Sequence, residues 1–179
     1  MTVGTQRADF LKRRGQAVLL FALILCAAAP GIPADKILDV GQRVPEFTLP
    51  GLDGKPVSFE KDVRGKAPLT LMFFMTTACS ACFEELEEID SFVRRHHGKV
   101  DVWCIAVDLR GIQTVAPFHH ANRFRVKYLI DPKFSLPRAF GFNYTPSLAI
   151  VDAKGVLLHK KGGYSPNERL SDLIRTFLK

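Results

Sequence analysis

An apolar run that ends just before two closely spaced cysteines is the feature of this sequence that most constrains its fold. Residues 69–75 read Leu-Thr-Leu-Met-Phe-Phe-Met, a composition typical of a central β-strand that is buried on both faces. Cys79 and Cys82 follow at once, and helical periodicity begins directly after them. The chain must therefore form a covered sheet, with the cysteines at the point where a strand passes into a helix.

Residues 83–97 predict an amphipathic helix. Its apolar side chains share one stripe, acidic residues crowd its beginning, and basic residues crowd its end. Both groups of charges complement the helix dipole, and Gly98 is a natural stop. The acidic residues are Glu84, Glu85, Glu87 and Glu88.

Further strands and helices alternate along the chain, as in an α/β domain. Asp53-Gly54 predicts a tight turn between short strands at residues 47–49 and 57–59. A capping box at residues 165–168 predicts the start of an amphipathic terminal helix. The remaining predicted strands cover residues 100–107, 128–130, 147–152 and 156–160, and the remaining helices cover residues 114–124 and 135–140. This order indicates one mixed sheet with helices on both faces, in a single domain of residues 35–179.

Residues 1–34 predict a signal peptide or an N-terminal membrane anchor. Positively charged residues precede an apolar run from Ala17 to Ala29, and Pro30 follows that run. This is the layout of a secretory signal, and the run is shorter than the roughly 18 residues of a spanning helix. We therefore expect the domain to lie in the periplasm, either free or tethered to the membrane through its N-terminus.

The charge of the chain is only mildly basic. It has 25 Lys and Arg residues against 18 Asp and Glu residues, a formal charge of +7, and part of the excess lies within residues 1–34. Such a bias is weak evidence for nucleic-acid binding. We expect no nucleic-acid partner, and we expect a monomer.

The two cysteines have the spacing of a redox-active pair. Thiols at positions i and i+3 of a helix start can close a small disulfide ring, and the helix N-terminus stabilises the thiolate of the outer one. We therefore expect Cys79 to attack a target disulfide and Cys82, one turn further in, to resolve the mixed disulfide. The acidic residues that follow oppose thiolate formation, because nearby negative charge raises the pKa of a thiol.

Other uses of the cysteines fit the sequence less well. A structural zinc site needs four ligands, and beyond the pair the chain offers only Cys104 and scattered histidines, so we expect no metal and no cofactor. An inert disulfide across so small a ring would stabilise the fold weakly. Cys104 shares a strand face with Val102 and Ala106, which predicts a buried free thiol, with a redox role as the alternative.

Several short motifs accompany the cysteine pair. They are Val44–Leu49, Leu52–Val57, Gly65-Lys66, Phe73-Phe74 at the end of the apolar strand, and Thr145-Pro146 before a later strand. With the CxxC pair they resemble the thioredoxin-like proteins of the TlpA/ResA type, which are exported or membrane-tethered thiol–disulfide oxidoreductases of bacteria. The resemblance implies a thioredoxin fold with an N-terminal β-hairpin extension. It also implies that Pro146 is cis, that it faces the CxxC pair, and that Thr145 and Pro146 bind substrate.

Glu85 lies three residues after Cys82, on the same helical face. In ResA-like proteins a glutamate at this spacing sits near the buried thiol and can move its proton, so the resemblance implies a catalytic role. The alternative is that Glu85 is one of several solvated acids. The chain also departs from the family pattern, with Ala78 in place of the usual Trp and Glu87 in place of a common Pro, which leaves the redox potential and the choice of partner open.

The sequence therefore predicts an enzyme, an exported thiol–disulfide oxidoreductase that reduces disulfides in periplasmic proteins and is recycled by a membrane or periplasmic thiol reductant. A peroxiredoxin-like peroxidase is one alternative, because Thr76 lies three residues before Cys79; however, Met72 stands where peroxiredoxins carry Pro. A copper-handling assembly protein is another, since two thiolates are soft ligands for Cu(I), but no third ligand stands nearby.

Overall fold

The computed structural model describes residues 37–96 and 98–178, so the predicted signal at residues 1–34 lies outside the described residues. In chain order the elements are β1 (Thr48–Pro50), β2 (Pro56–Ser58), the π-helical turn η1 (Phe59–Val63), β3 (Leu69–Met75), α1 (Ser80–Arg95), β4 (Val100–Ala106), α2 (Ile112–Asn122), β5 (Lys127–Ile130), α3 (Ser135–Ala139), β6 (Ser147–Asp152), β7 (Leu157–Gly162) and α4 (Leu170–Phe177).

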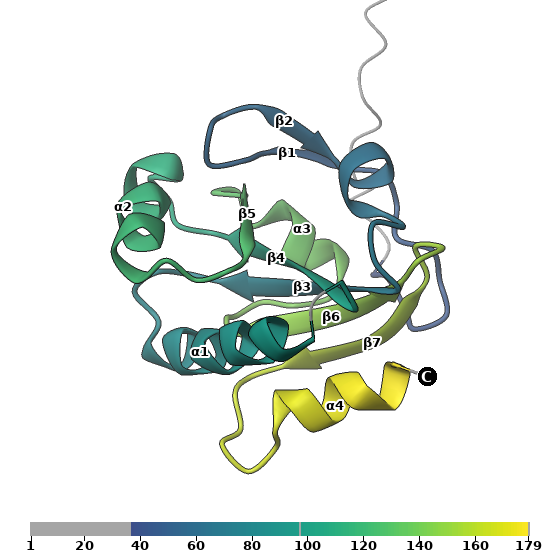
Figure 1. Cartoon of the computed structure of the whole chain (residues 1–179). Helices are drawn as coiled ribbons and strands as arrows, with labels where there is room; N and C mark the ends of the chain where they lie inside the picture. Colours follow the sequence, from purple (N-terminus) through teal and green to yellow (C-terminus); the bar gives the residue numbers. More distant parts are fainter. Residues whose placement is uncertain (1–36, 97, 179) are drawn as a thin grey trace, which may run out of the picture.

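Five strands form one mixed sheet in the order β5-β4-β3-β6-β7 (Figure 1). The β3–β4 and β4–β5 pairs are parallel, whereas the β3–β6 and β6–β7 pairs are antiparallel. Strands β1 and β2 form a separate antiparallel hairpin around the predicted turn. The thioredoxin-like fold with an N-terminal hairpin is therefore confirmed.

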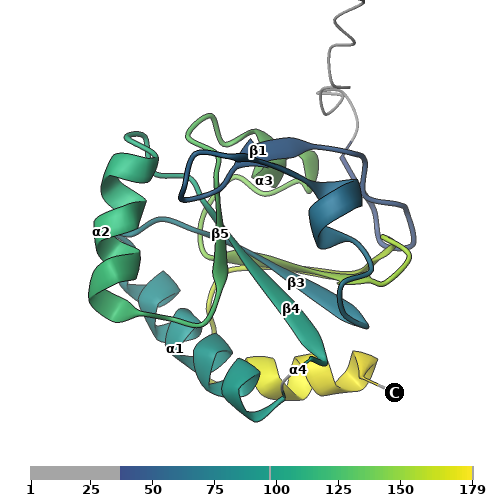
Figure 2. The same cartoon turned by 45° about the horizontal axis from the view of Figure 1, so that its top comes forward.

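Strand β3 lies at the centre and is buried along its whole length, as its composition predicted. Its alternate side chains enter two cores on opposite faces of the sheet, with Phe73 in one and Phe74 in the other. Residues of α1, α2 and α4 complete the first core, and residues of α3 and the N-terminal segment complete the second. Figure 2 shows α1 and α4 on one side of the sheet, with α3 and the hairpin on the other.

The N-terminal segment pairs with both edges of this sheet. On the β7 side, Leu157 donates its N–H to the carbonyl of Gln42 at 2.9 Å, and Val44 donates to the carbonyl of Gly155 at 2.8 Å. On the β5 side, Gly51 forms a β-bridge with Leu129. Backbone groups that an edge strand would otherwise present to other chains are thus partly occupied by the chain itself.

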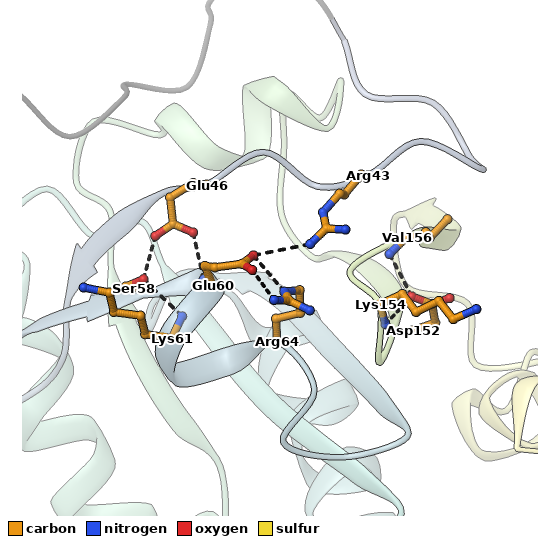
Figure 3. Close-up of polar contacts among 9 residues, drawn as sticks. All are labelled: Arg43, Glu46, Ser58, Glu60, Lys61, Arg64, Asp152, Lys154 and Val156. Carbon is orange, nitrogen blue, oxygen red and sulfur yellow. Dashed lines mark hydrogen bonds and ion pairs between the residues drawn. The ribbon is translucent and has the colours of Figure 1, made fainter.

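A polar network ties the hairpin to η1 (Figure 3). The carboxylate of Glu46 accepts a hydrogen bond from the Ser58 hydroxyl at 2.6 Å and from the Glu60 N–H at 2.8 Å. Glu60 in turn forms ion pairs with Arg64 and, at 3.6 Å, with Arg43. Because exposed ion pairs contribute only about 0–1 kcal/mol, the buried apolar residues of this segment must supply most of its attachment.

The terminal helix begins at Leu170, so the predicted capping box at residues 165–168 is wrong. Those residues form a turn in which the Glu168 N–H donates to the carbonyl of Ser165, and the Glu168 carboxylate pairs with Lys161 of β7. A carboxylate from another helix caps the observed start of α4: Glu88 of α1 accepts a hydrogen bond from the Ser171 N–H at 3.2 Å.

Candidate active site

The cysteine pair lies where β3 passes into α1. Cys79 is the N-cap residue of α1, in an extended backbone conformation, and its Sγ accepts a hydrogen bond from the Cys82 N–H at 3.0 Å. A disulfide joins Cys79 to Cys82, with 5.1 Å between their Cα atoms. The outer sulfur therefore stands among the unpaired N–H groups of the helix start, which favour negative charge there.

The two sulfurs differ in their access to solvent. Cys82 is fully buried, whereas Cys79 is partly exposed and Ser80 beside it is exposed. A target disulfide can therefore approach Cys79, while Cys82 is shielded inside the first turn. This is the asymmetry that a nucleophilic and a resolving thiol require.

Two further loops meet the cysteine segment at the same edge of the sheet. Met75 at the end of β3 pairs with Ala106 at the end of β4, so the loop after β4 runs beside the residues that lead to the cysteines. Phe74 pairs with Ser147, the first residue of β6, which brings the preceding Thr145-Pro146 peptide to this edge. That peptide is cis, as the resemblance implied.

Glu85 is buried, with 4% of its surface exposed, unlike the exposed Glu84 and Glu87. It therefore differs from the solvated acids of the alternative interpretation. Burial raises the pKa of its carboxyl to about 7; Lys161 opposes the shift and Glu88 adds to it. A carboxylic acid with this pKa can exchange a proton near neutral pH.

Glu85 lines a cavity of about 690 Å³ between α1, β7 and α4. His159 and Lys161 of β7 line the same cavity, and burial, followed by the charge of Lys161, lowers the pKa of His159. Nothing in the sequence near Glu85 indicated these neighbours, because they lie on a strand more than seventy residues further along the chain. Only the pairing of β6 with β7 brings them to the helix.

Cys104 has the buried position that strand alternation predicted. It is fully buried, carries a free thiol, and belongs to the same core as Val102 and Ala106. Burial raises the pKa of this thiol well above its ordinary value. Cys104 therefore packs as a small apolar residue and is a poor nucleophile.

Within residues 37–96 and 98–178, no three His, Cys, Asp or Glu side chains are grouped so that they could hold a metal ion. In the same part of the chain, every helix is too short or too polar to cross a bilayer.

Comparison with known proteins finds a thiol–disulfide oxidoreductase similar in sequence and solved structures similar in fold. Sporulation thiol-disulfide oxidoreductase A of Bacillus subtilis strain 168 is 25% identical over 167 residues, which cover 90% of this chain and 97% of that protein. A crystal structure assigned as the thiol:disulfide interchange protein DsbE of Chlorobium tepidum has a TM-score of 0.70 and 23% identity, covering 79% of this chain and 99% of that chain. The exposed lipoprotein thioredoxin Etrx1 of Streptococcus pneumoniae strain TIGR4 has a TM-score of 0.59 and 23% identity, covering 75% of this chain and 98% of that chain.

The fold, the disulfide at the start of α1 and the curated relative define the class of protein, a thiol–disulfide oxidoreductase. The chain belongs to the AhpC/TSA family, which it matches over residues 40–160.

Replacing Glu85 should change how stability depends on pH. In the folded, oxidised protein the carboxyl stays neutral up to about pH 7, whereas in the unfolded chain it ionises near pH 4.5. The contribution of Glu85 to the free energy of unfolding is therefore complete below pH 4.5 and falls as the pH rises through 7, by about 3 kcal/mol in all. Glu85→Gln removes this loss, so the variant should match the wild type at pH 4 and exceed it at pH 8.

Denaturant unfolding of the oxidised protein at both pH values measures this difference. Glu87→Gln, at an exposed position of the same helix, is the matched control and should follow the wild type. Parallel pH profiles for Glu85→Gln and the wild type would contradict the prediction.

Proposed function

We propose that this chain is an exported enzyme that reduces disulfides in protein substrates through Cys79 and Cys82. The observation that carries the proposal is the partly exposed Cys79 at the N-cap of α1, joined to a fully buried Cys82. The Cys79 thiolate attacks one sulfur of a target disulfide, and the other target sulfur leaves as a thiolate. Cys82 then attacks the Cys79 sulfur and releases the second target thiol, so the target gains two electrons and the enzyme ends as the disulfide.

A thiol trap tests this order of attack. In Cys82→Ser the mixed disulfide cannot be resolved, so a covalent adduct to substrate should accumulate on Cys79. Mass spectrometry of adducts from cells of the source organism would identify the cysteine involved. Cys79→Ser is the control and should form no adduct, and an adduct on Cys104 would contradict the assignment.

The acidic surroundings of the pair support a reducing direction. Strong oxidants among these proteins stabilise their reduced form, in which the attacking thiol is a thiolate. Here the helix start favours that thiolate, but the exposed Glu84 and Glu87 and the carboxylate of Asp108 disfavour it. We therefore expect a reduction potential nearer to the roughly −270 mV of thioredoxin than to the roughly −120 mV of DsbA, measured by equilibration with dithiothreitol or glutathione. A value near −120 mV would reverse the direction.

We further propose that Glu85 exchanges a proton with Cys82. The carboxyl is buried on the turn that follows Cys82, and burial holds its pKa at about 7, where a proton can move in either direction. A neighbouring negative charge disfavours a second anion, so the Cys82 thiol pKa should be raised in the reduced enzyme and should fall in Glu85→Gln.

Alkylation rates of Cys82 against pH, measured in a Cys79→Ser background, would detect this fall. Glu87→Gln should leave the Cys82 profile unchanged, because that side chain is exposed. Equal shifts in the two variants would mean that Glu85 acts only as part of a general acidic field.

The Thr145-Pro146 loop is the proposed binding surface for the substrate backbone. It lies at the sheet edge that carries the cysteine pair, and Tyr144 beside it is 53% exposed, which leaves an aromatic face available to a polypeptide. The substrates in this proposal are cysteine-containing proteins.

We propose that residues 1–34 export the domain of residues 35–179 and are either removed or kept as a membrane tether. The basic residues followed by an apolar run support export. An exposed lipoprotein among the similar structures supports a location outside the cytoplasm. Cell fractionation should recover the protein outside the cytoplasm, free or membrane-bound, and cytoplasmic recovery with an intact N-terminus would contradict this.

The peroxidase alternative is disfavoured by one contact. Its case rests on Thr76, the residue that would direct a hydroxyl at a peroxidatic Cys79. In this structure the Thr76 hydroxyl bonds instead to the Asp108 carboxylate at 3.2 Å.

A further inference from the structure

Asp108 is a buried carboxylate that lies beside the segment leading into the cysteine pair. It follows β4, whose last residue, Ala106, pairs in register with Met75 at the end of β3. The next N–H, of Val107, extends this pairing by donating to the Met75 carbonyl at 2.9 Å. Only 8% of Asp108 is exposed, so its charge is withdrawn from water and needs hydrogen-bond partners.

Those partners come from the two residues that follow β3. Asp108 Oδ1 accepts hydrogen bonds from the Thr77 hydroxyl at 2.6 Å and from the Thr76 hydroxyl at 3.2 Å. The Thr77 N–H donates to both carboxylate oxygens, at 3.1 Å and 3.2 Å. Hydrogen bonds to an ionised acceptor are roughly twice as strong as neutral ones, so this contact holds the segment firmly.

The network continues from the threonines to the reactive cysteine. The Thr76 hydroxyl accepts a hydrogen bond from the Ala78 N–H at 3.4 Å, and the Thr76 carbonyl accepts one from the Cys79 N–H at 3.2 Å. Thr76 therefore links Asp108 to the backbone of Cys79, because its hydroxyl bonds the carboxylate and its carbonyl accepts from the Cys79 N–H.

We propose that Asp108 is a positioning residue for the redox reaction, because it fixes Thr76 and Thr77 and thereby holds Cys79 at the N-cap of α1, within reach of Cys82. The inference rests on the proposed function only in taking this pair as the reacting thiols. Two thiols held in a fixed geometry close a ring more readily than two loosely held ones, because less freedom is lost on closure. Asp108 acts through the threonines and contacts neither sulfur in this network.

Equilibrium of the full-length chain with glutathione tests the proposal. The Cys79–Cys82 dithiol passes two electrons and two protons to oxidised glutathione, which is released as two thiols. Asp108→Ala should lower the equilibrium constant for closing the disulfide about tenfold, a shift of about 30 mV for this two-electron couple. Asp108→Asn, which keeps one acceptor oxygen, should recover part of the loss.

Thr77→Val separates positioning from charge. It removes the 2.6 Å hydrogen bond but leaves the Asp108 carboxylate in place, so a positioning role predicts a smaller change in the same direction. A purely electrostatic role predicts a wild-type constant for Thr77→Val and equal shifts for Asp108→Asn and Asp108→Ala. That outcome would overturn the proposal.

Asp131 provides the matched structural control. It is 2% exposed, follows β5 at the same edge, and accepts hydrogen bonds from the Ser135 hydroxyl at 2.8 Å and the Leu136 N–H at 2.7 Å. Asp131→Ala should therefore destabilise the fold without moving the glutathione equilibrium. An equal shift in Asp131→Ala and Asp108→Ala would also overturn the proposal. Because glutathione replaces any protein substrate, the result does not depend on whether the proposed reductase activity is correct.

Discussion

Burial of β3 on both faces is the constraint from which the arrangement of the site follows. Its side chains fill two cores at once, so the strand is fixed between α1 on one face and α3 on the other. The chain can leave the buried region only at the ends of β3. The cysteine pair lies in the first helical turn after the C-terminal end of this strand. The parallel neighbour β4 and the antiparallel neighbour β6 then bring Asp108 and the Thr145-Pro146 peptide to the same place.

The acidic residues around the cysteine pair differ in their environments. Several acids follow Cys82, yet burial keeps the Glu85 carboxyl largely neutral up to about pH 7. The Asp108 carboxylate accepts hydrogen bonds from Thr76 and Thr77. The positive end of helix α1 therefore faces Cys79, and the exposed Glu84 and Glu87 together with the Asp108 carboxylate oppose it.

Local patterns were enough to predict the central strand, the hairpin and the position of the cysteines at a helix start, because each depends on neighbouring residues. The predicted start of α4 was wrong. Ser165–Glu168 has the residue pattern of a capping box, but the Glu168 carboxylate forms an ion pair with Lys161 of β7 instead of capping the helix. Periodicity placed Glu85 on the face of Cys82, but its burial depends on β7 and α4, which are distant in sequence. Asp108 belongs to no recognisable sequence motif. Its proposed positioning role could be inferred only from the register of β3 and β4, which brings it beside the residues that lead to Cys79.

The pairing of the N-terminal segment with β7 also limits when the contacts at this edge of the sheet can form during synthesis. Gln42 and Val44 find their partners at Leu157 and Gly155, over a hundred residues later in synthesis. Contacts of such long separation form slowly, because the intervening chain must first be ordered. A nascent chain thus keeps residues 42–44 without these partners until residues 155–157 have been made, so the edge contact with β7 can form only after β7 has been synthesised.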